Sequence, residues 1–573
     1  MDNRRLLLAV ALSMAVLLVW GRVFPAKKVP PVPPDAVTSS AAPTGNGSEA
    51  ADVPPATLSA APAETTAPPP PAETPVVEAA AEQIVSLESS AAVAELTNRG
   101  AQLKSFRLKE YAAGDGGVLD LVRARGAGPY PFGLVGQDSN GLPVNDALFT
   151  VREEGEGAGK TLVFNYSGKL GVVEKRFSLG PNHLLEVEVT AAGTPPWALF
   201  LGPGIGNPSA SEAAGKLAKR GGVFSAAGDY VSLPAKSAKE VTSVAGGSGL
   251  SWAGLDDNYF LSVVIAEEAL GGARYVPGFF DNQDGKGLRF RPLPPGEIPR
   301  EVKALERDFA LEIYPAGNHL RAAAYLGAKK LDRLQALDRG LDHTIELGWF
   351  RILALPFMHA LQWIYKNVVA NYGWAIVLMT VLIKILLLPL THTTMVSMTK
   401  MQELGPKIQG IRNKYASKMR DKQGRPNFEI QKKINEETMA LYKAEGVNPA
   451  GGCLPMVLQL PVFIAFYNIL PASIELRQAP WIMWVKDLSA HDPLYVLPIV
   501  MGATQLLQML MTPATGNPLQ RRMMLMMPVV FTVMFLGFPA GLVLYWLTNN
   551  VLSIIQQAVY NRIKARNAAP ATP

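Results

Sequence analysis

Five long apolar segments lie between Gly348 and the C-terminus of this 573-residue chain, and they restrict its fold more than any other feature. Most are close in length to the roughly 20 residues with which an α-helix crosses a bilayer, and the fourth is shorter. Charged residues make up only 18% of the chain, below the roughly 25% that is usual in soluble domains. We therefore predict a multi-pass α-helical membrane protein. The predicted spans are 371–391, 449–471, 492–511, 523–538 and 540–560.

A further apolar run, Leu6–Trp20, lies near the N-terminus. It has two interpretations, a cleaved signal peptide or an uncleaved transmembrane anchor. Cleavage requires small residues just after the run, and the bulky Phe24 stands where one is needed. We therefore predict a transmembrane anchor over 1–24, with its N-terminus held in the cytoplasm by Arg4 and Arg5.

The region between the anchor and the apolar segments is soluble in character and has two parts. Residues 25–83 are rich in Pro and Ala. Such a stretch cannot bury enough apolar surface to offset its ordering entropy, so we predict a disordered linker. Over 84–335, short runs alternate apolar and polar residues, as in His183–Thr190, and Gly and Pro clusters separate them. This is the pattern of half-buried strands, and it predicts a large all-β sandwich.

The distribution of lysine and arginine indicates which side of the membrane each loop occupies. The loop over 392–447 is strongly basic, so we predict that it is cytoplasmic. The loop before the span at 492–511 contains few cations, which predicts the opposite side. With six spans and a cytoplasmic N-terminus, the tail over 561–573 is also cytoplasmic and the sandwich faces the periplasm. Residues 348–370 are aromatic and amphipathic, which predicts a helix lying in the membrane interface.

The basic loop has a helical pattern of its own. Its first half carries apolar residues spaced alternately by three and four, as in a coiled-coil seam, and a second helical run follows over 427–444. We predict a helical hairpin that projects into the cytoplasm. Its cations suit anionic lipid, ribosomal RNA or an acidic partner, although a solvated face explains any single lysine equally well. The seam residues are Met401, Leu404, Ile408, Ile411 and Tyr415, and the candidate contact residues are Lys407, Arg412, Lys414, Lys432 and Lys433.

Lys384 is the most informative single residue, because it lies inside the apolar span over 371–391. A cation at a helix centre costs about 2.5–3.5 kcal/mol on insertion scales. Its ammonium either reaches the membrane surface along its flexible stem or faces a water-filled cavity. Thr380, one turn earlier, and polar residues in other spans favour the cavity, although helix–helix hydrogen bonds explain most of them as well. These polar residues are Gln459, Thr504, Gln505, Gln508, Thr548, Asn549, Asn550, Ser553, Gln556 and Gln557.

The sequence contains no recognisable catalytic motif. It has no phosphate-binding loop of the G-x-x-x-x-G-K-[ST] type, no H-E-x-x-H and no G-x-S-x-G. The single cysteine, Cys453, excludes an internal disulfide framework and a zinc site built on a cysteine pair. We therefore expect neither an enzyme nor a bound cofactor or metal.

Several segments resemble the YidC family of membrane protein insertases. They are Tyr-Gly-Trp-Ala-Ile and Lys-Ile-Leu-Leu-Leu-Pro-Leu-Thr within 372–391, Tyr-Lys-Ala-Glu-Gly-Val-Asn-Pro-Ala-Gly-Gly-Cys-Leu-Pro at 442–455, Gln-Leu-Pro-Val-Phe at 459–463 and Gly-Leu-Val-Leu-Tyr-Trp-Leu-Thr-Asn-Asn from 541. The resemblance extends over 345–560 and is looser in the soluble region. The anchor, linker and large soluble domain are similar to those of the Gram-negative members.

The resemblance implies an insertase and chaperone of the bacterial inner membrane, which acts alone or with the Sec translocon. In this family a hydrophilic groove opens to the cytoplasm and the lipid, and a cation in it attracts the acidic N-terminal region of a substrate. That cation is usually arginine, whereas Lys384 keeps the charge without the planar fork. The other implied groove residues are Thr380, Tyr545, Trp546 and Gln459. The implied partners are nascent membrane proteins, the Sec translocon, the ribosome and anionic phospholipid, with no small-molecule substrate.

Two other classes of function are weighed against an insertase. A solute transporter would use Lys384 as its binding residue, but inverted repeats, which are common in transporters, are not visible in the sequence. A glycan-processing enzyme would use the sandwich, but that hypothesis is an analogy from fold alone.

Overall fold

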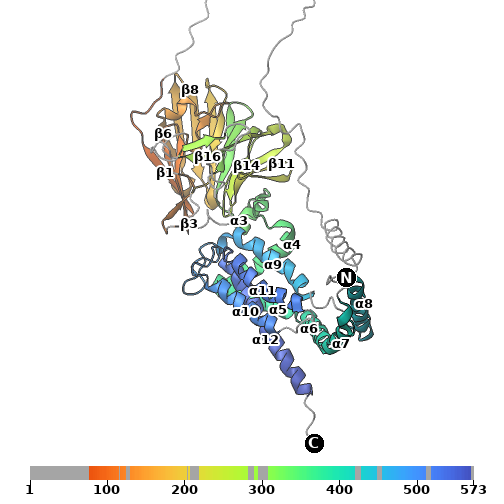
Figure 1. Cartoon of the computed structure of the whole chain (residues 1–573). Coiled ribbons are helices and arrows are strands. Elements are labelled where there is room, and N and C mark those ends of the chain that lie inside the picture. The colour runs from red at the N-terminus through yellow and green to blue at the C-terminus, as the bar shows by residue number, and fades with distance from the viewer. Residues whose placement is uncertain are drawn as a thin grey trace, which may run out of the picture.

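A computed structural model describes residues 76–114, 116–123, 129–202, 204–206, 219–281, 289–293, 307–419, 427–447, 454–511 and 518–568. The predicted anchor over 1–24 and most of the predicted linker over 25–83 lie outside these residues. Figure 1 shows a β-rich domain at one end of a helical region, with α12 (Ala540–Ala568) extending away at the other end.

The described strands of the soluble region form three antiparallel sheets. A nine-stranded sheet has the order β12-β11-β14-β15-β19-β9-β8-β7-β6. A six-stranded sheet has the order β13-β16-β18-β10-β5, with β17 paired to β16, and a four-stranded sheet runs from β1 to β4. The strands are β1 (Ile84–Glu88), β2 (Ala92–Thr97), β3 (Gln102–Ala112), β4 (Val118–Asp120), β5 (Leu134–Val135), β6 (Thr150–Glu154), β7 (Thr161–Gly168), β8 (Gly171–Leu179), β9 (Leu184–Ala192), β10 (Ala198–Leu201), β11 (Arg220–Ala226), β12 (Asp229–Pro234), β13 (Thr242–Ala245), β14 (Leu250–Asp257), β15 (Phe260–Ala266), β16 (Leu270–Asp281), β17 (Arg289–Pro292), β18 (Arg307–Pro315) and β19 (His319–Ala328).

Side-chain alternation builds the core of the sandwich. Along β9, Leu185, Val187 and Val189 are buried in the core between the sheets. On the facing six-stranded sheet, Phe309 and Leu311 of β18 point into the same core. Successive side chains of a strand alternate between its two faces, so this pattern follows directly from the sequence. The predicted all-β sandwich is confirmed.

The N-terminal boundary of the sandwich differs from the prediction. The linker was predicted to reach residue 83, but the chain already pairs with β7 at Val77, whose backbone exchanges hydrogen bonds of 2.9 and 3.0 Å with Ser167. The Asn98 amide also donates to the Ala81 carbonyl at 3.0 Å. Val77 and Ala81 make these contacts through their backbone groups, so the composition of the segment does not reveal them.

The sandwich and the helical region share a continuous core. Trp252 and Tyr325 of the nine-stranded sheet are buried in one cluster with Leu331 of α3 (Leu331–Ala336) and with Ala354 of α4 (Arg351–Asn367). Arg477, in the loop after α9, donates to the Ala112 carbonyl at 2.9 Å. The two parts are therefore packed against each other (Figure 1).

The remaining helices complete the C-terminal half. None of the described helices is, by itself, both long and apolar enough to cross a membrane, whereas α5 and α6 taken together meet that requirement as a pair bent by 64°. The helices are α5 (Tyr372–Leu386), α6 (Leu388–Glu403), α7 (Gly405–Lys414), α8 (Phe428–Ala444), α9 (Leu454–Ala472), α10 (Val496–Met511), α11 (Pro518–Phe535) and α12.

Two helix breaks differ from the predictions, and both coincide with a proline. The predicted span over 371–391 ends at Leu386, because Pro389 in the first turn of α6 has no N–H and its ring cannot follow a straight helix. The predicted seam from Met401 is interrupted at Leu404, after which α7 begins at Gly405 with Pro406 in its first turn. Leu404 and Ile408 nevertheless pack in the hairpin core, against Leu441 of α8.

Candidate functional site

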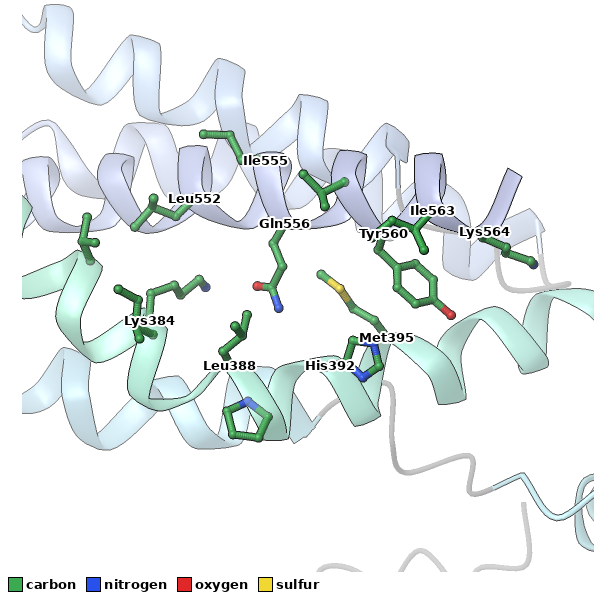
Figure 2. Close-up of a pocket in the computed structure, with 14 residues that line it drawn as sticks. Lys384, Leu388, His392, Met395, Leu552, Ile555, Gln556, Tyr560, Ile563 and Lys564 are labelled. Carbon is green, nitrogen blue, oxygen red and sulfur yellow. The ribbon is translucent and has the colours of Figure 1, made fainter. Parts of the chain in front are cut away.

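A cavity of about 1090 Å³ lies between the bent pair α5–α6 and the C-terminal half of α12 (Figure 2). The bend turns α6 away from the axis of α5, while α12 passes along both helices. Most of the lining is aliphatic or aromatic. The lining residues are Val381, Lys384, Ile385, Leu388, Pro389, His392, Met395, Leu552, Ile555, Gln556, Val559, Tyr560, Ile563 and Lys564.

Lys384 lies at the α5 end of this cavity. Its Nζ donates to Asn549 Oδ1 at 2.9 Å and to Ser553 Oγ at 2.8 Å, both on α12. Within the described part of the chain, both of its hydrogen-bond partners are neutral and it makes no ion pair. The sequence left two interpretations of Lys384, an ammonium at the membrane surface or one facing a cavity. In the structure the ammonium lies between α5 and α12, beside a cavity.

One hydrogen bond and one aromatic contact lie further along the cavity. Gln556 Nε2 of α12 donates to Thr391 Oγ1 of α6 at 2.9 Å. The rings of His392 and Tyr560 meet edge to face, with centroids 5.8 Å apart. Figure 2 shows Gln556 between the Lys384 end and the His392–Tyr560 end of the cavity.

The sequence prediction overlooked part of this lining. His392 and Tyr560 are not among the predicted site residues, and the sequence analysis names Gln556 and the two Lys384 partners, Asn549 and Ser553, only as polar residues of a span. A signal for them exists, because residues 549, 553, 556 and 560 are separated by four, three and four, the spacing of one helix face.

The other four predicted groove residues do not line the described cavity. Thr380 is buried, and its hydroxyl donates to the Ile376 carbonyl of its own helix at 2.7 Å. Tyr545 is fully buried and is in contact with Gln459 Nε2. Trp546 packs among aromatic rings, including Phe463 at 5.2 Å between centroids.

The predicted groove residues therefore lie in two separate places. Tyr545 precedes the cavity residue Leu552 by seven positions on α12, roughly 10 Å along the helix. It sits in the packed core of the bundle, stacked on Phe466 at 4.4 Å between ring centroids. Sequence spacing alone could not separate the two places, because the polar residues of α12 do not show which neighbouring helix they meet.

Lys407, Lys414 and Lys432, which are among the predicted hairpin contact residues, have glutamate partners within the hairpin. Lys407 pairs with Glu445 at 2.6 Å and Lys414 with Glu437 at 2.9 Å. Lys432 lies 4.0 Å from Glu436. Lys433 is exposed, and the Arg412 side chain lies on the same hairpin. Exposed pairs of this kind reduce the positive charge that the hairpin presents.

Comparison with known proteins identifies the family of both halves. Residues 363–567 match the model of the 60Kd inner membrane protein family, and residues 85–360 match the YidC periplasmic domain. A membrane protein insertase YidC of Syntrophus aciditrophicus (strain SB) is 35% identical over 583 residues, covering 98% of this chain and 99% of that protein.

Two further proteins are similar to this chain. A membrane protein insertase YidC of Geobacter metallireducens (strain ATCC 53774 / DSM 7210 / GS-15) is 36% identical, covering 98% of each chain. The crystal structure of an active YidC insertase with its first transmembrane domain resolved aligns with 85% of this chain and 95% of its own, at 17% identity and a TM-score of 0.35. Because sequence identity to the two relatives extends over nearly the whole length, the chain belongs to the YidC family of membrane protein insertases.

Proposed function

We propose that this chain is a membrane protein insertase and chaperone that places integral membrane proteins in the bacterial inner membrane, alone or with the Sec translocon. The observation that carries the proposal is the Lys384 ammonium, held at a largely apolar cavity by neutral partners. The names of the full-length relatives support the same function. Neither covalent chemistry nor a nucleotide is part of this mechanism.

The cavity attracts one kind of substrate segment. A cation without a counter-charge, in surroundings less polarisable than water, attracts an anion over several ångströms. An acidic residue in the N-terminal region of a nascent membrane protein supplies that anion. The ammonium thereby lowers the cost of bringing a polar segment part of the way into the bilayer, and the charge rather than a fixed hydrogen-bond geometry selects the substrate.

Exposed apolar side chains on α10 and α11 provide a surface along which the substrate can move into lipid. Leu507 and Leu510 of α10 and Val530 and Val533 of α11 are exposed. Large exposed apolar surfaces mark membrane or protein contacts. The apolar segment of the substrate leaves along such helix faces into lipid, while its acidic region is still held at Lys384.

The proposed topology has six spans, both termini in the cytoplasm and the sandwich in the periplasm. The bent α5–α6 pair then enters the bilayer from the periplasmic side and emerges at the basic α7–α8 hairpin. The charge distribution of the loops supports this orientation. The hairpin is proposed to meet the ribosome and anionic phospholipid through its basic side chains, of which Lys433 is exposed and Arg412 is half-buried.

Insertion of matched substrates tests the proposal. Two single-span substrates that differ only in an acidic or a neutral N-terminal tail are presented to the full-length protein in proteoliposomes. We expect Lys384→Glu to lower insertion of the acidic substrate about tenfold or more, equivalent to roughly 1.4 kcal/mol, and to spare the neutral one. Lys384→Arg is the matched control and keeps both activities. Equal insertion of the acidic substrate by Lys384→Glu and by the unaltered protein would remove the charge from the mechanism.

A further inference from the structure

The two residues that hold Lys384 share one face of α12. Asn549 and Ser553 are separated by four positions, so their side chains lie one above the other. Their oxygens receive hydrogen bonds from the Lys384 Nζ at 2.9 and 2.8 Å. The contact therefore joins α5 to α12 at the end of the cavity, through uncharged acceptors.

The hydrogen-bonding capacity of each group decides its role. The Ser553 hydroxyl donates its only hydrogen to the Asn549 backbone carbonyl at 2.8 Å, so towards the ammonium it acts as an acceptor. An ammonium has no acceptor, so the amide of Asn549 must face it with Oδ1. Two of the three ammonium donors are thus used within the described residues, and one remains for a group in the cavity.

We propose that Asn549 and Ser553 are positioning residues, which hold the Lys384 ammonium at the cavity without neutralising it and so produce the preference for acidic substrate segments. This inference rests on the function proposed above and assigns its selectivity to named side chains. Neutral acceptors keep a flexible lysine from extending to the membrane surface. A carboxylate in the same place would hold the ammonium equally well, but it would cancel the charge.

The opposite end of the cavity shows the contrasting arrangement. Lys564 also lines the cavity, but its Nζ is 2.8 Å from a carboxylate oxygen of Glu403 and both side chains are well exposed. A cation that already has a carboxylate partner in water attracts a second anion only weakly. Of the two lysines of the cavity lining, Lys384 is thus the one whose charge is available to a substrate.

Replacing Asn549 with aspartate separates position from charge. Asn549→Asp keeps the shape and the hydrogen bond to Lys384, and strengthens the tie between α5 and α12. If the amide only holds two helices together, insertion is retained. If its neutrality matters, we expect insertion of the acidic-tail substrate to fall about tenfold while the neutral-tail substrate is inserted as before, with no decrease in the melting temperature of the full-length protein.

A matched control is Gln556→Glu. It makes the same amide-to-carboxylate change on the same helix face, roughly 10 Å further along α12, where the amide contacts Thr391 instead of Lys384. We expect a clearly smaller decrease for the acidic substrate than in Asn549→Asp. An equal decrease would show that any negative charge in the cavity is sufficient, and would overturn the assignment to Asn549.

The remaining outcomes also decide the question. Unchanged insertion of the acidic substrate by Asn549→Asp, or an equal loss of both substrates, overturns the inference. If Asn549→Asp does not fold, the double variant Asn549→Ala/Ser553→Ala is measured, and a selective decrease for the acidic substrate is required. Failure of the proposed function would be recognised separately, because Lys384→Glu would then insert both substrates normally.

Discussion

Two lysines, the fully buried Lys175 of the sandwich and the half-buried Lys384 of the helical region, show how differently a cation without a carboxylate partner can be accommodated. Lys175 of the sandwich is fully buried, and its Nζ donates to the carbonyls of Gly100, Ala101 and Phe132 at 2.7, 3.3 and 2.7 Å. Lys384 has two neutral acceptors and borders a cavity. Within the described residues, the first ammonium uses all three of its donors, whereas the second uses two.

The comparison teaches that burial alone does not mark a functional lysine. Burial lowers the pKa of Lys175 to about 7, so even a fully hydrogen-bonded ammonium is costly to bury. Its three carbonyl partners leave no position for a ligand, so its role is to complete the sandwich core. Space beside the ammonium, rather than the unusual environment itself, distinguishes Lys384.

The largest expected effect on stability is at Lys175. Lys175→Met removes the only described side-chain donor to three buried carbonyls, each of which is costly to leave unpaired. We expect the free energy of unfolding of the sandwich to fall by roughly 2–4 kcal/mol, measured by urea denaturation of the full-length protein. A loss below about 1 kcal/mol would show that the ammonium is not needed to satisfy these carbonyls.

Acid should destabilise the sandwich through a second buried group, His183. Burial, and then the charge of Arg333, lowers the pKa of His183 to about 4. In the unfolded chain this histidine takes up its proton near pH 6.5, so stability is lost as pH falls from about 6.5 to 4. We expect a loss on the order of 2 kcal/mol.

The measurement is the free energy of unfolding of the full-length protein as a function of pH, compared with that of His183→Gln. Burial raises the pKa of Asp257 to about 6, which gives the opposite slope in part of this range. Subtracting the pH profile of His183→Gln from that of the unaltered protein removes the contributions of Asp257 and of all other groups that the two proteins share. Identical pH profiles for the unaltered protein and His183→Gln would contradict the assignment.

At Lys384 the same removal of charge should leave stability nearly unchanged. Lys384→Met takes away a cation at a cavity, and its two partners on α12 can be hydrated there. We expect a change below about 1 kcal/mol in the free energy of unfolding, together with a selective loss of acidic-substrate insertion. A loss of stability comparable to that of Lys175→Met would mean that Lys384 is also a structural residue.

The smallest effect is expected at the exposed end of the cavity. Glu403→Gln removes the partner of Lys564, and exposed ion pairs contribute roughly 0.2–1 kcal/mol at most. We expect the free energy of unfolding to fall by no more than about 0.5 kcal/mol. Insertion of the acidic substrate should improve slightly, because Lys564 loses its counter-charge. Reduced insertion of that substrate would contradict the role given to the two cavity lysines.

Much of the architecture was predictable from local patterns. Alternation in segments such as Leu184–Ala192 predicted the sandwich, because strand side chains alternate between core and solvent. The run over 427–444 predicted a helix where the structure has α8 with Asn427 as its cap. The breaks at Leu387 and Leu404 are not part of the sequence prediction, although Pro389 and Pro406 are visible, because a proline in such a run either kinks one helix or stands in the first turn of a new one, and the local sequence does not distinguish the two.

By itself, the sequence determined that this chain has a soluble β-rich part, a series of apolar helices and one lysine in an apolar segment, because these features depend on the periodicity and composition of single segments. The tertiary structure decided that Lys384 meets Asn549 and Ser553, while Gln459 and Tyr545 meet each other elsewhere in the bundle. That pairing depends on how α12 is rotated about its axis relative to α5, which results from packing between segments more than 100 residues apart and which no local pattern records.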